Sequence, residues 1–271
     1  MSTPGKARPM TVPAFAKRKG GDEPLTVLTA YDRPTTLTAE AAGVDALLVG
    51  DSLGNVLLGH DSTLPVTLEE ITHHARAVGR VRERALLIVD MPAFSYHVSP
   101  EESVRNAATI VRASGADAVK LEGGAKRVPM IRAILDAEVP VMGHLGLTPQ
   151  SVLTMGGYRV QGKSDAAAEA LVADAKALTE AGVFAIVLEG IPGPVAERIT
   201  REVAVPTIGI GAGPHCDGQV LVYHDMLGMT PDRPPKFVRQ YDSLYGRQVE
   251  AIERWVADVR QGSFPGDAET Y

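Results

Sequence analysis

The sequence predicts an α/β protein of the (β/α)₈ class, a TIM barrel, from three observations. Eight short and nearly continuous apolar runs recur along the 271 residues, as expected for strands that are covered on both faces. Amphipathic segments with helical spacing lie between these runs. A small-residue joint containing glycine recurs where a helix gives way to a strand. Eight β–α alternations in about 230 residues suit one closed barrel.

The strands are predicted first, because each apolar run is bounded by polar, glycine or proline residues. In chain order they are TVLTAY (26–31), ALLVGD (46–51), ALLIVD (85–90), AVKLE (118–122), VPVMGH (139–144), AIVLE (185–189), PTIGIG (206–211) and QVLVYH (219–224).

Helices are predicted between the strands, most clearly over 100–115 and 164–182. The second opens on Ser164, a suitable N-cap, and closes on Gly182, a typical helix stop. Glycine joints of this kind lead into three of the strands, at 42–46, 114–118 and 181–185.

The chain is expected to form one domain, because no linker rich in proline, glycine and serine divides it. Residues 1–20 are predicted to be a flexible N-terminal arm, and 21–271 a single barrel catalytic domain with a C-terminal helical tail. The tail, roughly 236–260, carries the only tryptophan, Trp255. An open doubly wound sheet is the competing architecture.

Composition argues against two classes of binding partner and favours one cellular compartment. The net charge of −6 and pI near 5.7 argue against a nucleic-acid partner, whose binding surface is basic. No apolar run approaches the roughly 20 residues that span a bilayer, so no membrane partner is expected. Cys216 is the single cysteine, which favours a reducing, cytoplasmic location.

Acidic residues end four of the predicted strands, namely Asp51, Asp90, Glu122 and Glu189. The carboxyl ends of the strands form the catalytic mouth of a barrel. Alternation places Ala118, Lys120 and Glu122 on one face, Glu189 with Val187, Asp90 with Ile88 and Asp51 with Val49. The four acids and Lys120 are therefore expected to converge on one axial pocket.

A single acid after a strand is often a helix N-cap, a role open to Asp51 and Asp90. Glu122 and Glu189 are poor caps, and each is followed by glycine. Carboxylates this close need a cation, and an oxygen-only ligand set favours Mg²⁺. A Mg²⁺ ion that binds a 2-oxo acid would stabilise an enolate, while a free carboxylate removes the neighbouring proton.

Long segments of the chain resemble the ketopantoate hydroxymethyltransferase family, from about residue 10 to residue 265. They are LTAYD (28–32), VGDSLGNVLLGHDSTLPVT (49–67), VDMPAFSY (89–96), GADAVKLEGG (115–124), PVMGHLGLTPQS (140–151), GGYRVQGK (156–163), IVLEGIP (186–192) and IGIGAGPHCDGQVLVYHDMLG (208–228).

The resemblance implies hydroxymethyl transfer from 5,10-methylenetetrahydrofolate to 3-methyl-2-oxobutanoate through a Mg²⁺-stabilised enolate. The product would be 2-dehydropantoate, for pantothenate and coenzyme A biosynthesis, and the assembly a homodecamer. Mg²⁺ would be held by Asp51 and Asp90, with Glu122 directly or through water. The implied substrate residues are Asp51, Ser52, Asp90, Lys120 and the pocket histidine His144, and the implied general base is Glu189.

Two departures from the family pattern are expected to affect the fit of folate or substrate rather than the chemistry. The chain has Ala93-Phe94 where the family usually reads Phe-Gly, and Gly190-Ile191 where it often reads Cys-Val.

Three other functions fit parts of the sequence less well. Gly50 to Gly54 fits the G-x-S-x-G pattern of serine hydrolases, but no HGGG-type oxyanion segment accompanies it. A lyase or mutase of the isocitrate lyase and phosphoenolpyruvate mutase type is disfavoured, because its K-K-C-G-H motif is absent. A silent barrel that only binds a 2-oxo acid or folate would not need a base.

Overall fold

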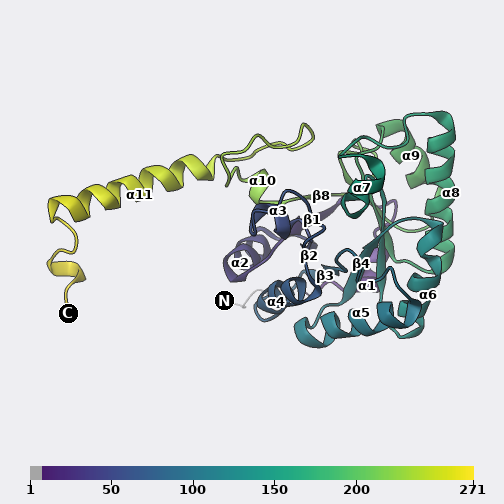
Figure 1. Ribbon diagram of the computed structural model, residues 1–271, viewed down its shortest axis with the longest axis horizontal. Helices are drawn as coiled ribbons and strands as arrows, with labels where there is room; N and C mark the ends of the chain where they lie inside the picture. The colour runs from purple at the N-terminus through teal and green to yellow at the C-terminus, as the bar shows by residue number, and fades with distance from the viewer. Residues whose placement is uncertain (1–7) are drawn as a thin grey trace, which may run out of the picture. The chain divides into compact units, whose positions relative to one another are not determined.

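The computed structural model describes residues 8–271, and its strands form a closed, all-parallel barrel (Figure 1). The order is sequential, and β8 pairs with β1 to close it, with Val220 opposite Val27. The predicted (β/α)₈ class is confirmed and the open doubly wound sheet is excluded. The strands are β1 (Leu25–Thr29), β2 (Ala46–Val49), β3 (Leu86–Asp90), β4 (Ala118–Glu122), β5 (Val141–Gly146), β6 (Ala185–Glu189), β7 (Thr207–Ile210) and β8 (Gly218–Leu221).

Helices cover the outside of the barrel (Figure 1). The longer ones are α2 (Arg33–Ala42), α4 (Leu68–Gly79), α5 (Pro100–Ser114), α6 (Val128–Asp136), α8 (Asp165–Ala181) and α9 (Gly193–Glu202). The predicted caps of α8 are present, since the Ser164 hydroxyl accepts from the Ala167 N–H and Gly182 adopts a left-handed conformation. Shorter turns follow some strands: α3 (Leu53–Val56), η1 (Ala125–Arg127), η2 (Pro149–Ser151) and α7 (Val152–Met155).

Each connection from β1 through β7 contains a helix, but the connection from β7 to β8 does not. Residues 211–217 lead from β7 to β8 without a helix, so the prediction of regular alternation is wrong here. Gly211 and Gly213 have positive φ, and Pro214 follows, a combination that disfavours helix.

Residues Tyr223–Tyr271 form a compact unit of their own. It contains α10 (Tyr223–Met226), α11 (Leu244–Gln261) and η3 (Asp267–Glu269). The 18-residue α11 overlaps the predicted tail, ends one residue beyond it and has no buried residue; Trp255 is 53% exposed. No helix within residues 8–271 is both long and apolar enough to span a membrane.

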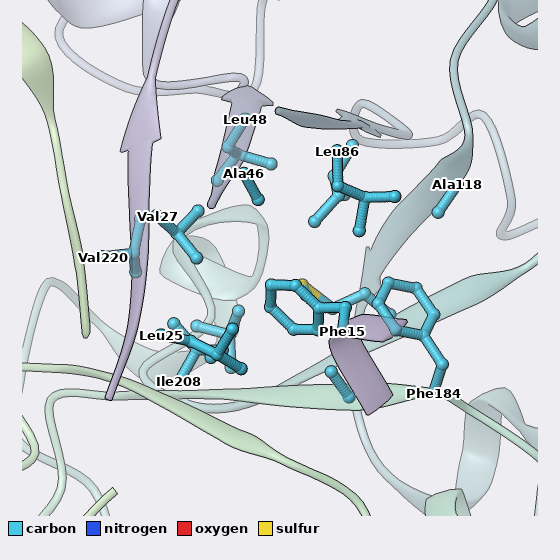
Figure 2. Packing of buried hydrophobic residues seen from close by; sticks show 14 of the residues in the cluster. Phe15, Leu25, Val27, Ala46, Leu48, Leu86, Ala118, Phe184, Ile208 and Val220 are labelled. Carbon is cyan, nitrogen blue, oxygen red and sulfur yellow. The ribbon is translucent and has the colours of Figure 1, made fainter. Parts of the chain in front are cut away.

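Alternate residues of the strands fill the barrel (Figure 2). Ala46 and Leu48 of β2 belong to this interior cluster, as do Leu86 and Ile88 of β3. Val49 is not part of this interior cluster. The prediction that Val49 and Asp51 share one face is therefore wrong, because neighbouring residues of a strand, such as Leu48 and Val49, point to opposite faces. Asp51 instead leaves from the turn after β2, whose last residue is Val49.

The amino-terminal segment closes one end of the barrel. Helix α1 (Val12–Ala16) is capped by the Thr11 hydroxyl, and its Phe15 is fully buried in the interior cluster. The Phe15 ring packs edge-on against Phe184, with ring centroids 5.8 Å apart (Figure 2). Residues 1–7 lie outside the described residues. The remainder of the predicted flexible arm is instead partly a structural plug, because an aromatic side chain in the cluster removes apolar surface from water.

Truncation of this plug is expected to destabilise the barrel without touching the carboxylates. Phe15→Ala should lower the free energy of unfolding by about 3–5 kcal/mol, the usual range for a fully buried aromatic. Urea unfolding followed by circular dichroism measures it. Phe237→Ala, at a 41% exposed ring, is the control. Equal stability of Phe15→Ala and wild type would contradict the plug.

Asp217 fastens the same segment to the barrel. Its carboxylate accepts from the Gly20 N–H at 2.9 Å and the Thr207 N–H at 2.8 Å, and pairs with Lys19 Nζ at 2.9 Å. Burial opposes ionisation, but the Thr207 N–H, the Lys19 ammonium and the Gly20 N–H outweigh it. The pKa of Asp217 therefore lies below its ordinary value.

A depressed carboxyl pKa stabilises the fold above the unfolded pKa of about 4, and this contribution is lost as the pH falls through the folded pKa. Asp217→Asn should therefore cost about 1–3 kcal/mol at pH 7. Its difference from wild type should shrink below pH of about 4. Urea unfolding across this range tests it, with exposed Asp22→Asn as control. A difference that stays constant to low pH would rule out the charge as its source.

Candidate functional site

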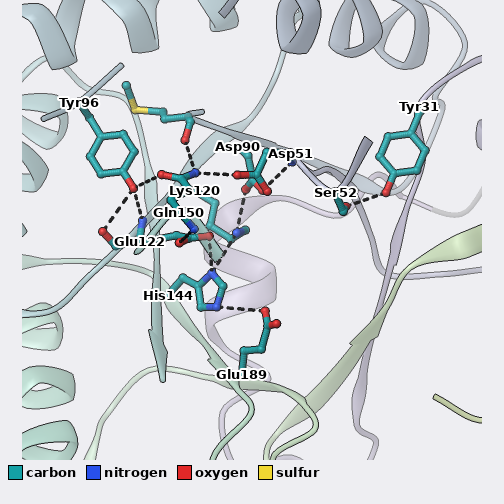
Figure 3. A network of polar contacts seen from close by, with 11 residues as sticks. Tyr31, Asp51, Ser52, Asp90, Tyr96, Lys120, Glu122, His144, Gln150 and Glu189 are labelled. Carbon is teal, nitrogen blue, oxygen red and sulfur yellow. Dashed lines mark hydrogen bonds and ion pairs between the residues drawn. The ribbon is translucent and has the colours of Figure 1, made fainter. Parts of the chain in front are cut away.

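The parallel register brings the predicted site residues together at the carboxyl ends of neighbouring strands. Asp90 of β3 lies beside Lys120 of β4, and Glu122 of β4 lies beside His144 of β5. Glu189 ends β6 opposite Gly146. All these side chains lie in one polar network (Figure 3), which also contains Asp51 and Ser52.

The first part of the network joins two aspartates and a lysine. Lys120 Nζ lies 2.9 Å from Asp90 Oδ1, and the Asp51 N–H donates to Asp90 Oδ2 at 3.1 Å. All three residues are at most 4% exposed. Glycine at position 50 suits the turn that carries Asp51, since a Cβ there would lie 2.9 Å from Ser52 Oγ and 3.4 Å from Asp90 Oδ2. The backbone thus approaches the site closely where the sequence reads Gly-Asp-Ser.

The second part of the network places His144 between two glutamates (Figure 3). Its Nδ1 lies 3.5 Å from Glu122 Oε1, and its Nε2 lies 3.3 Å from Glu189 Oε2. Nδ1 is also 3.3 Å from Lys120 Nζ, so it accepts from the ammonium when neutral and donates to Glu122 when protonated. His144 is 2% exposed, whereas the Glu189 side chain is 16% exposed. Glu189 is therefore the most accessible carboxylate of this network.

Gln150 and Tyr96 belong to the network, although sequence reasoning did not single them out. Gln150 Nε2 donates to Asp51 Oδ2 at 2.8 Å, and the Gln150 backbone N–H donates to Glu122 Oε2 at 3.0 Å. The fully buried Tyr96 hydroxyl donates to Gln150 Oε1 at 2.5 Å. Both residues stand in segments quoted for the family resemblance, which was the available signal.

Ser52 lies beside the aspartates but has no hydrolase-like partner. Its Oγ is 2.8 Å from the Tyr31 hydroxyl (Figure 3). A nucleophilic serine needs a neighbouring general base, usually histidine. The Ser52–Tyr31 pair does not provide one, and the network instead offers Ser52 as a hydrogen-bonding group.

Burial and mutual repulsion dominate the electrostatics of the aspartates. Burial, then the charges of Asp90 and Glu122, raise the pKa of Asp51 well above its ordinary value. Burial also raises the pKa of Asp90, although Lys120 opposes this. Two buried carboxylates that resist ionisation side by side are typical of a site that takes a further cation.

Positive groups offset the burial of Glu122 more fully than they offset the burial of the aspartates. Burial opposes ionisation of Glu122, but His144 and Lys120 outweigh it and hold the Glu122 pKa below its ordinary value. Burial and Lys120 lower the pKa of His144, yet its contacts with Glu122 and Glu189 prevail and raise it to about 9. These contacts favour the doubly protonated imidazole.

The donor set fits a magnesium ion in part. Among residues 8–271, no three His, Cys, Asp or Glu side chains come together as a ready metal-binding group. Mg²⁺, however, commonly uses only one or two carboxylates and completes its shell with water and substrate oxygens. Asp51 and Asp90 supply two adjoining carboxylates, whereas Glu122 is engaged by His144 and Gln150.

Comparison with known proteins gives a family match over nearly the whole chain. Residues 9–267 match the family model described as ketopantoate hydroxymethyltransferase. The 3-methyl-2-oxobutanoate hydroxymethyltransferase of Moorella thermoacetica is 53% identical over 262 residues, covering 97% of each chain. The protein of the same name from Koribacter versatilis is 54% identical and covers 97% of this chain and 89% of its own.

Solved structures with lower identity share the fold. A 2,3-dimethylmalate lyase of the PEP mutase/isocitrate lyase superfamily is 18% identical, with a TM-score of 0.59 covering 93% of this chain and 88% of its own. A phosphonopyruvate hydrolase complexed with oxalate and Mg²⁺ is 16% identical, with a TM-score of 0.61 covering 97% and 92%. At these identities the likeness concerns the barrel alone.

Proposed function

Because the chain belongs to the ketopantoate hydroxymethyltransferase family, we propose that it transfers a hydroxymethyl group from 5,10-methylenetetrahydrofolate to 3-methyl-2-oxobutanoate. The product is 2-dehydropantoate, for pantothenate and coenzyme A biosynthesis. One observation carries the proposal beyond the family. A partly accessible carboxylate, Glu189, stands across His144 from a buried cluster of acids that suits a cation.

The cation is proposed to be Mg²⁺, which would be held by Asp51 and Asp90, with Glu122 directly or through water. Bound Mg²⁺ would supply positive charge that polarises the substrate ketone and stabilises an enolate. The raised pKa values of both aspartates support this, since a cation removes the cost of ionising them together.

The charged and hydroxyl groups beside the aspartates are proposed to bind and orient the substrate. The buried Lys120 ammonium is a fixed positive charge that would face the substrate carboxylate. Ser52 Oγ lies 2.8 Å from the Tyr31 hydroxyl and can donate to the same carboxylate when Tyr31 is the donor of that pair. His144 is proposed to border the substrate while fixing the direction of Glu189.

Glu189 is the proposed general base for the C3 proton of the oxo acid. Gln150 or the Asp51 N–H donates to each of the other three carboxylates of the network. Among residues 8–271, the ionic partner of Glu189 is His144. Holding the base in place lowers the entropic cost of proton removal. The resulting C3 carbanion equivalent forms the new C–C bond to the methylene carbon of the folate. Water supplies the hydroxyl oxygen, and the C–N bond to the folate breaks as its nitrogen takes up a proton and tetrahydrofolate leaves.

We also propose that the enzyme works in the cytoplasm as a homodecamer. The buried, unpaired Cys216 is consistent with a reducing compartment. Self-association is supported by an apolar stripe on α11 whose members are 37–57% exposed, namely Tyr245, Val249, Ile252, Trp255 and Val259. Light scattering during size-exclusion chromatography tests the stoichiometry.

A ¹³C-labelling experiment tests whether the folate is the donor of the hydroxymethyl carbon. Enzyme, Mg²⁺ and 3-methyl-2-oxobutanoate are mixed with tetrahydrofolate carrying a ¹³C-methylene group. The proposal expects one ¹³C in the hydroxymethyl carbon of 2-dehydropantoate, detected by mass spectrometry and NMR. Labelled product from ¹³C-formaldehyde without tetrahydrofolate, and none from the folate, would refute the donor.

A further inference from the structure

Gln150 has an unusually complete set of contacts for a neutral side chain. Nε2 donates to Asp51 Oδ2 at 2.8 Å and to the Met91 carbonyl at 3.0 Å. Oε1 accepts from the Tyr96 hydroxyl at 2.5 Å. Both amide protons are thus directed at acceptors, which fixes which end of the amide faces Asp51.

Tyr96 fixes the other end of the amide. Its hydroxyl accepts from the Glu122 backbone N–H at 3.1 Å. Its single proton has two acceptors within reach, Gln150 Oε1 at 2.5 Å and the Glu122 carbonyl at 3.4 Å, and the shorter contact favours Gln150. The ring is fully buried, and the Arg127 guanidinium lies 5.5 Å from its centroid. A series of hydrogen bonds therefore runs from the end of β4 through Tyr96 and Gln150 to Asp51 (Figure 3).

These contacts distinguish the two carboxylate oxygens of Asp51. Oδ2 receives an amide proton and must act as an acceptor there, while Oδ1 accepts no hydrogen bond from the described residues. The Asp51 N–H meanwhile donates to Asp90 Oδ2. Gln150 thereby occupies one Asp51 oxygen, and the other keeps its capacity to accept.

We propose that Gln150 is a positioning residue that presents Asp51 to the divalent cation, with Tyr96 holding Gln150 in the required orientation. This rests on the proposed function, because that function places Mg²⁺ at Asp51 and Asp90. Groups that orient metal ligands typically change metal affinity 10–100-fold when removed.

The test uses Gln150→Leu, which removes both side-chain donors but keeps the backbone N–H that serves Glu122. Calorimetric titration of the full-length protein with MgCl₂, without either substrate, should show a Kd raised about 10–100-fold. The Mg²⁺ concentration for half-maximal C3 exchange should rise in parallel. Exchange at saturating Mg²⁺ should largely recover, which a general loss of structure would not allow.

Tyr96→Phe provides a second variant with little change in volume. It should raise the Mg²⁺ Kd by a smaller factor, and it should add little in the Gln150→Leu background, because Tyr96 acts through Gln150. Gln219→Leu is the matched control, since its side chain is exposed on β8 and donates to the Gly213 carbonyl, away from the carboxylates. It should leave the Kd unchanged.

The outcomes separate the two proposals. If Gln150→Leu binds Mg²⁺ with the same Kd as the wild-type protein, the role of Gln150 is overturned, while the proposed function stands. Fully additive effects of the two variants would overturn the role of Tyr96. A folded wild-type protein that binds no Mg²⁺ would overturn both this inference and the proposed metal chemistry.

Discussion

Glu189→Gln is expected to lower both C3 exchange and turnover by about 10²–10⁴-fold, the usual contribution of a positioned general base. Glutamine keeps an oxygen that can accept from His144 Nε2, which lies 3.3 Å from the carboxylate in the wild type. The geometry of the network should therefore survive. Only the capacity to take the proton is removed.

Binding of 3-methyl-2-oxobutanoate distinguishes this from a lost substrate site. Calorimetry in the presence of Mg²⁺ should give a Kd for the oxo acid within a few-fold of wild type, because Glu189 is not proposed to hold the ground state. Glu180→Gln, at an exposed position on α8, is the matched control. Near-normal exchange by Glu189→Gln would show that another group removes the proton.

Asp90→Asn is expected to have the second large effect, about 10²–10⁴-fold on Mg²⁺-dependent exchange, the equivalent of several kcal/mol of charge stabilisation. Asp90 contributes a proposed cation ligand and also the anionic partner of buried Lys120, 2.9 Å away. The substitution leaves that ammonium without its nearest carboxylate. Removing one partner of a buried ion pair typically costs about 3–5 kcal/mol.

Two measurements therefore separate the roles of Asp90. Magnesium titration should show weaker binding, and urea unfolding at pH 7 should show lower stability, whereas the exposed Asp136→Asn at the end of α6 should change neither. Unchanged Mg²⁺ affinity with lowered stability would restrict Asp90 to its ion pair with Lys120.

The sequence was most informative where a single strand carries the chemistry. On β4, alternation alone placed Ala118 in the barrel interior and Lys120 and Glu122 above it, and the structure has all three buried. Which strands are neighbours followed from the barrel class. The contacts of Asp90 with Lys120, and of Glu122 with His144, are direct consequences of that register.

Prediction failed where turns, rather than strands, set the direction of a side chain. Strand alternation put Asp51 on the same face as Val49, but only Asp51 enters the network, because it leaves from the turn after Val49. Gln150 lies in the 3₁₀ turn η2, where no periodicity marks a polar residue as inward-pointing. Such positions depend on tertiary contacts that a single sequence does not display.

The amino-terminal plug was missed for a related reason. Phe15 is one aromatic side chain in a short segment rich in lysine, arginine and proline, which is typical of an arm. Its burial depends on the open end of the barrel that Phe184 borders, a feature that exists only after the strands have closed.

The central claim is that this barrel forms an enolate of the oxo acid through Glu189 beside a Mg²⁺ site. Proton NMR of 3-methyl-2-oxobutanoate in D₂O, with enzyme and Mg²⁺ but no folate, tests it most directly. The C3 proton signal should disappear with wild-type enzyme, persist when Mg²⁺ is chelated, and persist with Glu189→Gln. A folded protein supplied with Mg²⁺ that leaves the signal intact would contradict the claim.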